Sequence, residues 1–363
     1  VFGHEQKVET DFGILNQSLK EKSLKAQFYS GLMMPVMQNL NTLNYVIITI
    51  VGALLAIFRG FDVGGLAAFL QYSRQFGRPI NELASLYNSI QAAIAGAERI
   101  FEIIDEAPEQ KDAPDAITLE KTKGDVALKN VYFGYRPEKT ILKGVSLHAA
   151  AGKKIALVGA TGAGKTTILN LLPRFFDIQS GEITIDNHPI DRIRRDSLRR
   201  SMAIVLQDTH LFTGTVRENI RFGRLNATDE EVVAAARLTA AHSFIKRLPQ
   251  GYDTLLENDG ANLSQGQRQL LNIARAAVAD PAILLLDEAT SNIDTRSEIL
   301  IQKGLDQLMQ GRTSLIIAHR LSTIRNADTI LVLEHGEIIE QGSHQELLAL
   351  KGKYYSLNEE QFK

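Results

Sequence analysis

The sequence predicts a helical N-terminal segment followed by an α/β domain built on a largely parallel sheet. In the first part, no charged residue lies between Lys25 and Arg59, so a helix over this stretch would run for about 50 Å without a charge. Beyond residue 124, short apolar runs alternate with helical patterns, as in sheets whose parallel strands are joined by helices. A length of 363 residues is typical of about two domains.

The charge-free stretch is long enough to cross a hydrocarbon layer of about 30 Å. Its second half, Tyr45 to Phe58, is nearly all apolar. Its first half contains five polar side chains: Gln38, Asn39, Asn41, Thr42 and Asn44. Amides are costly against lipid, so they should face other helices or a water-filled cavity. Because these residues and Pro35 lower the hydropathy, a buried helix of a soluble protein remains the alternative.

A break at Arg59 to Asp62 separates this stretch from a second helical segment, Val63 to Ala97. Three charged residues interrupt the second segment: Arg74, Arg78 and Glu82. Hydropathy alone therefore does not identify it as transmembrane. The lysines at positions 20, 22 and 25 favour a cytoplasmic start for the first helix.

Composition excludes several classes of function. The 40 basic and 42 acidic residues give a net charge of −2 without a clustered basic face, so no nucleic-acid partner is expected. There is no cysteine, which excludes disulfides, thiolate zinc sites and cysteine nucleophiles. Residues 1–25 mix both signs of charge without an apolar core, so no signal peptide is predicted. Because the chain begins at Val1, we expect a fragment whose N-terminal part is missing.

The helical pattern ends by Asp105, and the charged, proline-containing stretch from Glu106 to Asp115 is typical of a linker. We therefore predict a helical segment over residues 1–105, a linker over 106–123 and the α/β domain over 124–363. Six segments of that domain have strand patterns: Val126 to Tyr132, Lys154 to Val158, Ile183 to Ile185, Ala203 to Leu206, Ile283 to Leu286 and Leu315 to Ala318. The sheet should be more antiparallel near the start of the domain.

The segment from Gly159 to Thr166, Gly-Ala-Thr-Gly-Ala-Gly-Lys-Thr, matches the phosphate-loop pattern G-x-x-x-x-G-K-[ST]. It follows the strand Ile155 to Val158 and precedes a helical run, which is the context that this motif requires. The glycines let backbone N–H groups surround phosphate oxygens, Lys165 neutralises phosphate charge, and the Thr166 hydroxyl can bind Mg²⁺. The segment thus predicts a site for nucleotide phosphates.

Two adjacent carboxylates end the apolar strand Ile283 to Leu286. Adjacent strand residues point to opposite sides of a sheet. Asp287 could therefore serve the magnesium shell while Glu288 meets a water molecule near the γ-phosphate. A solvated strand end is the alternative interpretation.

Three other residues are weaker candidates when taken singly. His319 follows the apolar run Leu315 to Ala318, where an imidazole could contact the γ-phosphate, but a lone histidine is more often structural. Gln207 follows the strand Ala203 to Leu206 and by itself indicates only polar surface. Tyr135 could stack a purine, although isolated aromatic residues more often belong to the core.

The run Leu263-Ser264-Gln265-Gly266-Gln267 comes before apolar residues at helical spacing. It therefore lies at a helix start, where free N–H groups favour anions. An ordinary helix cap is the alternative, because serine and glycine are common at that position.

With these motifs in this order, Gly124 to Phe362 resembles the nucleotide-binding domain of ABC transporters, an α/β P-loop NTPase fold with a helical subdomain. The run Leu263 to Gln267 resembles the family signature, and Gly159 to Thr167 resembles Walker A. The other correspondences are Asp287 and Glu288 with Walker B, Ser291 to Asp294 with the D-loop, Tyr135 with the adenine-stacking loop, Gln207 with the Q-loop and His319 with the switch histidine.

The resemblance implies an ATPase that uses ATP and Mg²⁺. The implied catalytic residues are Glu288, His319, Gln207 and Lys165. The implied ATP contacts are Tyr135, Gly159, Ala160, Thr161, Gly162, Ala163, Gly164, Lys165, Thr166 and Thr167, together with Ser264, Gly266 and Gln267 for the ATP held by a partner subunit. The implied magnesium ligands are Thr166, Gln207 and Asp287.

Upstream, Phe28 to Asp105 looks like the last two transmembrane helices of exporter-type half-transporters, and is similar to multidrug and lipid exporters. The stretches Tyr72 to Phe76 and Ala97 to Phe101 carry this resemblance. It implies an integral membrane protein of a bacterial-type plasma membrane, with the ATP-binding domain in the cytoplasm. The implied cargo is an amphipathic small molecule, a drug or a lipid, and four transmembrane helices would precede Val1.

The family works as two half-transporters, with two ATP molecules held between Walker A of one and the signature of the other. This chain has Gln265 where the usual signature has glycine, and Glu257 to Gly260 replaces the common Gly-Glu-Arg-Gly type of loop. We therefore expect a heterodimer in which this half keeps a competent base, Glu288. A homodimeric exporter, a degenerate subunit and a soluble ABC ATPase remain alternatives, and the charge-free stretch argues against the last.

Overall fold

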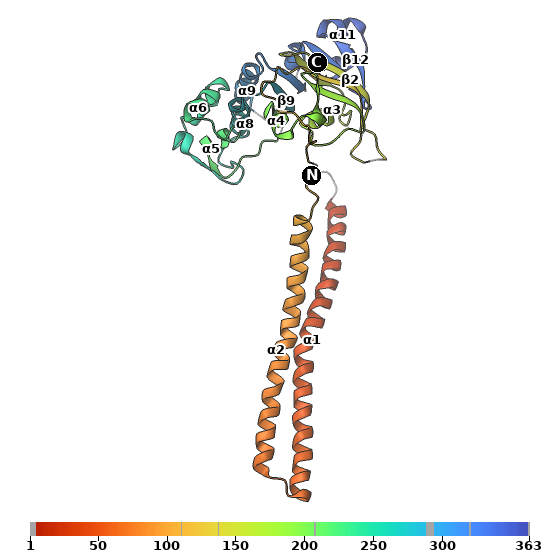
Figure 1. The fold of residues 1–363 in the computed structure, drawn as a ribbon, viewed down its shortest axis with the longest axis vertical. Coiled ribbons are helices and arrows are strands. Elements are labelled where there is room, and N and C mark those ends of the chain that lie inside the picture. Colours follow the sequence, from red (N-terminus) through yellow and green to blue (C-terminus); the bar gives the residue numbers. More distant parts are fainter. Residues whose placement is uncertain are drawn as a thin grey trace. The chain divides into compact units, whose positions relative to one another are not determined.

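The computed structural model describes residues 5–109, 111–136, 138–206, 208–287, 294–318 and 321–361. The chain divides into two compact units, Val1–Glu109 and Gln110–Lys363. The first unit is a pair of long helices, and the second is an α/β domain (Figure 1).

The helix pair consists of α1 (Glu5–Arg59) and α2 (Val63–Ile104), so the predicted break between them is confirmed. The carboxylate of Asp62 caps α2 by accepting from the backbone N–H groups of Gly64 at 3.2 Å and Gly65 at 2.7 Å. Gly52 of α1 is buried, and a Cβ there would collide with the side chain of Leu66 in α2. The missing side chain therefore lets the two helices approach closely.

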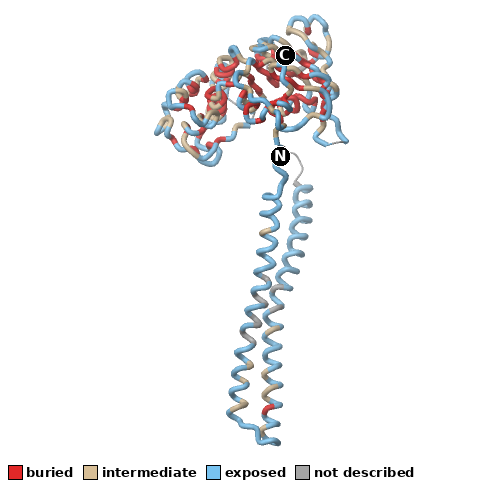
Figure 2. Tube along the Cα trace, viewed as in Figure 1, coloured by how far each residue is buried: buried red, intermediate tan, exposed pale blue. Residues whose placement is uncertain are grey.

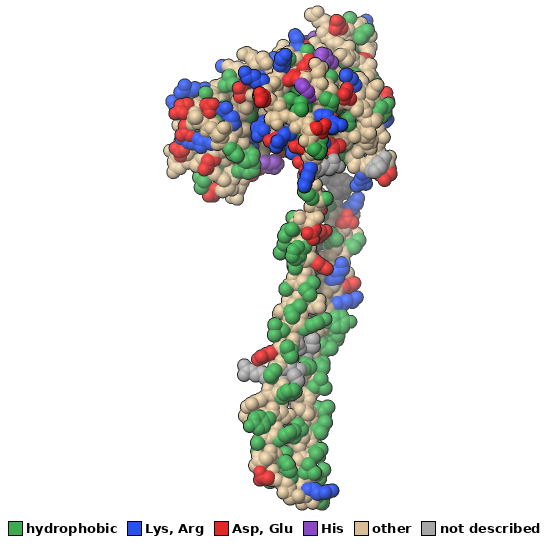
Figure 3. All heavy atoms as spheres, viewed as in Figure 1, with side chains coloured by type: hydrophobic (Ala, Val, Ile, Leu, Met, Phe, Trp, Pro, Cys, Tyr) green, Lys and Arg blue, Asp and Glu red, His purple; other side chains and the backbone are tan. Residues whose placement is uncertain are grey.

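The surface of the helix pair is apolar along most of its length. Most residues of both helices are exposed (Figure 2), and they include large hydrophobic side chains such as Phe58 and Phe76, part of the hydrophobic surface in Figure 3. Among the described helices, only Gln6–Arg59 is long and apolar enough to cross a membrane, with a mean hydropathy of 2.0 in its most apolar window. An apolar surface of this extent requires lipid or further helices to cover it.

The α/β domain has a central six-stranded sheet in the order β12-β11-β3-β10-β9-β6. Its strands are β3 (Lys154–Val158), β6 (Met202–Val205), β9 (Ile283–Asp287), β10 (Thr313–Ile317), β11 (Thr329–Glu334) and β12 (Glu337–Gly342). All neighbouring pairs are parallel except β11 with β12. The prediction of a largely parallel sheet is confirmed.

An antiparallel four-stranded sheet in the order β2-β1-β4-β5 lies near the start of the domain, as predicted. Its strands are β1 (Val126–Phe133), β2 (Leu142–Ala149), β4 (Ser180–Ile185) and β5 (His188–Pro189). A small pair, β7 (Gly214–Thr215) with β8 (Leu255–Leu256), stands apart from both sheets.

The two faces of the central sheet pack against different layers because side chains alternate along each strand. Ile283 and Leu285 of β9 belong to the core shared with the antiparallel sheet. Leu284 and Leu286 belong to the core shared with the helices between β6 and β9. The buried residues of both cores lie in the α/β domain (Figure 2). The near-continuous apolar runs of these strands follow from burial on both faces.

The segment between β6 and β9 forms the predicted helical subdomain (Figure 1). Its helices are α5 (Val216–Arg221), α6 (Asp229–Leu238), α7 (His242–Ile245), α8 (Gln265–Ala279) and the 3₁₀ turn Gly251–Asp253. The other helices of the domain are α3 (Lys165–Leu171), the 3₁₀ turn Ile190–Arg192, α4 (Arg195–Arg200), α9 (Thr295–Leu308), α10 (Leu321–Arg325), α11 (His344–Leu350) and α12 (Lys353–Gln361). Both α5 and α6 pack on α8.

The segment from Asp112 to Leu119, inside the predicted linker, is docked on α4 and the turn before it. The Asp112 carboxylate accepts from the backbone N–H of Arg195 at 3.2 Å and also pairs with its guanidinium. Ile117 forms a parallel bridge with Ile193. The backbone N–H of Leu119 donates to the Ser197 hydroxyl at 3.0 Å. We call residues 112–119 the strap, because backbone hydrogen bonds hold it along the domain.

A single carboxylate fixes the chain where the predicted linker meets β1. Asp186 accepts from the backbone N–H groups of Lys123 at 2.7 Å, Gly124 at 3.1 Å and Asp125 at 2.9 Å. Its φ of 49° lies in the left-handed region, where aspartate and asparagine are better tolerated than most residues. The Asp186 side chain thus fixes the segment that leads into β1, and the same residue forms the turn after β4.

We predict that Asp186→Ala destabilises the domain by about 2 kcal/mol, because three N–H groups lose a charged acceptor. The midpoint of thermal unfolding of the solubilised protein should fall by about 4 to 8 °C. Asp186→Asn keeps one acceptor oxygen and the tolerance of positive φ, so its midpoint should fall less. Equal losses in the two variants would show that the carboxylate is not what holds this segment.

Candidate functional site

The carboxyl ends of β3, β6, β9 and β10 lie at one edge of the central sheet, because these strands are parallel neighbours. Gly159 follows β3, Leu206 follows β6, Asp287 ends β9 and Ala318 follows β10. Crevices at this edge of a parallel sheet are where open α/β folds bind ligands. The structure therefore brings the described residues of four sequence motifs to one edge of the sheet.

Three of the predicted catalytic residues, Gln207, Glu288 and His319, lie outside the described residues. So do Ser291, Asn292 and Ile293 of the predicted D-loop. The described residue immediately before each of the three lies at the shared edge. Asp294 is described and caps α9, accepting from the Ser297 N–H at 3.0 Å.

The loop between β3 and α3 requires glycine at two positions. Gly164 caps α3 with a φ of 105°, and no side chain caps this helix. At Gly159, a Cβ would collide with the carbonyl oxygen of Leu333. The backbone can thus turn sharply at the start of α3 and leave its first N–H groups available to an anion.

Lys165 is the cation of this loop, and it is 8% exposed. Its Nζ donates to the carbonyl oxygens of Gly159 at 2.7 Å and Ala160 at 2.9 Å, which wraps the loop around the ammonium. Burial lowers the pKa of Lys165, whereas the nearby charge of Asp287 opposes that change. A buried ammonium beside free N–H groups suits a multiply charged phosphate.

The remaining loop residues divide into exposed and buried positions. Ala160, Thr161, Gly162 and Thr166 are exposed, so the Thr166 hydroxyl is free to reach a ligand or metal from the first turn of α3. Ala163 and Thr167 are buried beneath the loop. The Thr167 hydroxyl accepts from the Tyr135 hydroxyl at 3.2 Å, which connects the loop to the predicted purine contact.

Tyr135 lies in an aromatic cluster rather than in the core. Its ring packs edge-on against Phe133 and Phe176, each with centroids 5.0 Å away, yet the residue is 48% exposed. An exposed ring that is held by two neighbours and one hydrogen bond is preorganised for stacking. The core interpretation of Tyr135 is therefore wrong.

The pentapeptide from Leu263 to Gln267 begins α8 with a capping box. The Ser264 hydroxyl accepts from the Gln267 N–H at 3.3 Å, and the Gln267 side chain accepts from the Ser264 N–H at 3.0 Å. Gly266 is buried, whereas Ser264 and Gln265 are exposed. The expected helix start is confirmed, and the Ser264 hydroxyl still has its proton to donate.

A polar cluster beside Gln265 was not found from the sequence. The pocket there is lined by Asp208, Thr209, His210, Asp259, Gln265, Arg268 and Gln269. The Thr209 hydroxyl donates to the buried side chain of Gln269, and the Asp259 carboxylate accepts from the Leu211 N–H at 2.6 Å. The sequence signal that could have indicated this cluster is Gln269, a polar residue on the buried face of an amphipathic helix.

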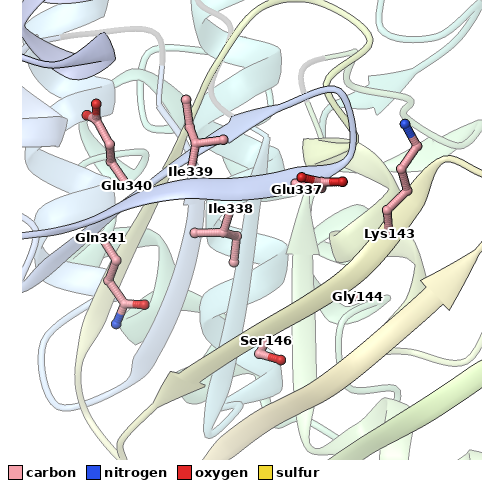
Figure 4. Close-up of a pocket in the computed structure, with 8 residues that line it drawn as sticks. All are labelled: Lys143, Gly144, Ser146, Glu337, Ile338, Ile339, Glu340 and Gln341. Carbon is pink, nitrogen blue, oxygen red and sulfur yellow. The ribbon is translucent and has the colours of Figure 1, made fainter.

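A second hollow lies between the edge strands β2 and β12 (Figure 4). Lys143 of β2 and Glu337 of β12 lie toward one end of it, and Gln341 lies toward the other. None of the predicted site residues that the structure describes lines this hollow, and we assign no ligand to it.

Comparison with protein families matches an ABC transporter model to residues 142–291 and an ABC transporter transmembrane region to residues 1–80. The chain belongs to the ABC transporter family. Its fold is accordingly an ABC transmembrane region followed by an ABC ATPase domain with a helical subdomain. The protein is therefore an integral membrane protein, which excludes the soluble ABC ATPase.

The curated relatives include proteins of several bacteria. An uncharacterized ABC transporter ATP-binding protein, YfiC, of Bacillus subtilis is 50% identical over 99% of this chain and 60% of its own length. A fatty acid ABC transporter ATP-binding/permease protein of Mycobacterium tuberculosis is 46% identical over 98% of this chain and 56% of its own length. An ATP-dependent lipid A-core flippase of Syntrophus aciditrophicus is 43% identical over 96% and 58%. The chain thus spans less than two thirds of these relatives.

A solved structure of a bacterial Atm1-family ABC exporter with ATP bound is similar over the whole chain. The TM-score is 0.78 at 38% sequence identity, and the match covers 64% of that exporter. The chain therefore has the fold of the matching part of an ABC exporter.

We predict that Tyr135→Ala weakens ATP binding by about tenfold, because base stacking on an aromatic ring contributes about 1 to 3 kcal/mol. Tyr135→Phe keeps the ring and loses only the hydrogen bond to Thr167, so its Kd should stay within about threefold of the wild type. Titration with a fluorescent ATP analogue measures both. A tenfold loss in the phenylalanine variant would instead assign the effect to the Thr167 contact.

Proposed function

We propose that this chain is the ATP-hydrolysing part of an ABC exporter half-transporter, which couples ATP binding and hydrolysis to export of an amphipathic molecule. The observation that carries the proposal is the shared sheet edge, where a buried Lys165 inside its phosphate loop lies close to Asp287. An ABC transmembrane region in the same chain supports coupling to transport. The ATP-binding domain would lie in the cytoplasm of a bacterial-type plasma membrane.

Within this proposal, each residue at the edge has one role. The backbone N–H groups of the loop and Lys165 bind the phosphates, and Tyr135 stacks the adenine. Glu288 polarises the attacking water as a general base, while His319 and Gln207 contact the γ-phosphate and its surroundings. Positioning and charge neutralisation supply most of the catalysis in phosphoryl transfer.

Mg²⁺ would be held by the Thr166 hydroxyl, Asp287 and Gln207 together with phosphate oxygens. The exposed hydroxyl of Thr166 and the strand-end carboxylate of Asp287 are hard oxygen donors, which is the ligand type that Mg²⁺ prefers. The ion would neutralise phosphate charge as ATP binds.

The signature residues would act on ATP bound by a second half-transporter. Ser264 and Gln265 are exposed at the start of α8, where helix N–H groups favour an anion, and Gly266 and Gln267 complete the helix start. Gln265 puts an exposed amide where the usual signature has glycine, and we take this departure to favour a heterodimer over a homodimer. Closure of the two nucleotide-binding domains would then drive the transmembrane helices.

The domain limits and the cargo belong to the same proposal. We assign residues 1–105 to the transmembrane part, 106–123 to the linker and 124–363 to the ATP-binding domain. The names of two relatives, a fatty acid transporter and a lipid A-core flippase, support a lipid or another amphipathic substrate. Membrane lipid would surround the apolar surfaces of α1 and α2.

Glu288→Gln should leave ATP binding intact and slow hydrolysis by at least about two orders of magnitude, the usual effect of losing a positioned general base. Phosphate release by the full-length protein in lipid measures the turnover, and equilibrium ATP binding is the control. Unchanged turnover would refute the assigned role.

The pKa of Lys165 should make ATP binding sensitive to alkaline pH. Phosphate favours the protonated lysine, so binding takes up a proton wherever the free lysine is partly neutral. Because burial lowers the pKa of the free lysine, ATP affinity should fall as the pH rises through that value and stay constant below it. Measuring Kd from about pH 7 to 10 tests this, with Lys165→Arg as a control that stays charged. A flat wild-type profile would contradict it.

The heterodimer proposal predicts that the purified full-length subunit alone has low ATPase activity, and that a different half-transporter restores it. Size-exclusion chromatography and turnover in lipid, with and without candidate partners, measure this. A stable dimer of the single subunit with full activity would favour the homodimer instead.

A further inference from the structure

Arg74 is a cationic side chain in the N-terminal half of α2, one of the two long helices. Arg74 of α2 stacks on the ring of Tyr45 in α1, with the guanidinium carbon 4.1 Å from the ring centroid. Beside it, the Asn44 amide of α1 donates to the Ser73 hydroxyl of α2 at 3.1 Å. These two contacts join the helices at the same level.

The depth of Arg74 follows from helix geometry. Arg74 is eleven residues from the start of α2 and its partner Tyr45 is fourteen from the end of α1, or about 17 to 21 Å from the turn at 1.5 Å per residue. The hydrocarbon layer is about 30 Å thick. No charged residue lies between Asp62 and Arg74, so a hydrocarbon layer that begins at the turn would include this arginine.

A charge at this depth is costly and normally faces a protein interior or a water-filled cavity, where it serves a function. Among the described residues, no carboxylate forms an ion pair with Arg74, and its recorded contact is the neutral ring of Tyr45. Arg74 is also exposed on the surface of the helix pair. Within the described residues, the positive charge of Arg74 thus has no anionic partner.

The surroundings of Arg74 combine hydrogen-bond donors with apolar surface. Helical spacing places Gln38 and Asn41 on the face of α1 that carries Tyr45, and Gln71 on the face of α2 that carries Arg74. These three amide side chains are exposed. Large hydrophobic side chains are exposed on the same helices, including Leu40 and Phe69. Such a surface fits a molecule with an acidic head and an alkyl chain.

We propose that Arg74, held by Tyr45 and flanked by these amides, binds the acidic headgroup of an amphiphile inside the membrane region. The headgroup would be a carboxylate or a phosphate, with its alkyl chain along the apolar faces of α1 and α2. This inference rests on the proposed export function and specifies the substrate class as anionic. The guanidinium provides a fork of donors that matches both headgroups.

The test compares two probes that share a chain and differ in charge. The full-length half-transporter with its partner half is placed in phosphatidylcholine nanodiscs, and binding of radiolabelled oleate and oleyl alcohol is measured against empty discs. The wild type should bind oleate at least about tenfold more tightly than the alcohol, the ratio expected for charge-assisted hydrogen bonds. Arg74→Gln should remove this preference.

Two further variants keep the result interpretable. Arg74→Lys retains the charge and should retain part of the oleate preference, which covers the case in which the glutamine variant fails to assemble. Arg59→Gln removes a charge at the turn between the helices and should leave the preference unchanged. Oleate preference that survives Arg74→Gln, or that is lost equally in Arg59→Gln, would overturn the proposal. No preference in Arg74→Lys, if the glutamine variant does not assemble, would also overturn it.

Separate arms distinguish a resident lipid from a cargo and this site from the transporter function. If a bilayer lipid supplies the headgroup, discs containing phosphatidylglycerol should weaken oleate binding in the wild type and not in Arg74→Gln. If oleate is handled as cargo, it should stimulate ATP turnover in the wild type only. Absent turnover with intact oleate preference would refute the export function alone. Normal turnover without charge preference would refute the headgroup site alone.

Discussion

The parallel arrangement of β3, β10, β9 and β6 is the constraint on which the rest of the ATP-binding domain depends. Because neighbouring strands run in one direction, the segments that follow them all emerge at the same edge. The register places Leu157, Ile317 and Asp287 in one row across three strands. A slip of one residue in β9 would turn Asp287 to the other face of the sheet and remove its charge from the side of Lys165. Burial of both sheet faces opposes such a slip, since it would exchange the two cores.

The strap gives this edge a structural connection to the chain that follows α2. It lies on α4, and α4 leads directly into β6, whose end precedes Gln207. Arg195 at the start of α4 is nearly buried, and its guanidinium lies 3.8 Å from Asp177, which also pairs with Arg174 after α3. One short helix thus contacts the strap and the end of the phosphate-loop helix. Hydrogen bonds and ion pairs thus join the strap, α4 and the residues that follow α3.

The two units of the chain distribute apolar and charged side chains in opposite ways. In the ATP-binding domain, the core is apolar and most charged side chains lie outside, with Lys165, Arg174 and Arg195 as buried exceptions, whereas the helix pair exposes apolar side chains over most of its surface (Figure 3). Two contacts join polar groups across that pair: the hydrogen bond of Asn44 with Ser73 and the stacking of Arg74 on Tyr45. In an apolar medium such contacts stabilise the helix pair, because a polar group without a partner has no water molecule to bind.

The sequence by itself determined the features that depend on neighbouring residues. The strand before Gly159, the glycines of the loop, the break at Arg59 to Asp62 and the helix start at Ser264 follow from periodicity, turn chemistry and capping, all of which act over a few positions. All six predicted strands lie within three residues of their observed limits, because buried apolar runs are distinctive. The choice between a ligand contact and a core position for Tyr135 could not be made from the sequence, because a single aromatic residue does not show whether its ring is exposed.

Only the tertiary structure decided which distant residues meet. It placed Asp287 near Lys165, bound the strap to α4 and stacked Arg74 on Tyr45. The order of strands in the sheet, on which the shared edge depends, was likewise decided only by the tertiary structure. These contacts join residues that are far apart in sequence, so no local pattern encodes them. They are selected by the burial of whole faces of helices and sheets, a property of the folded chain as a unit.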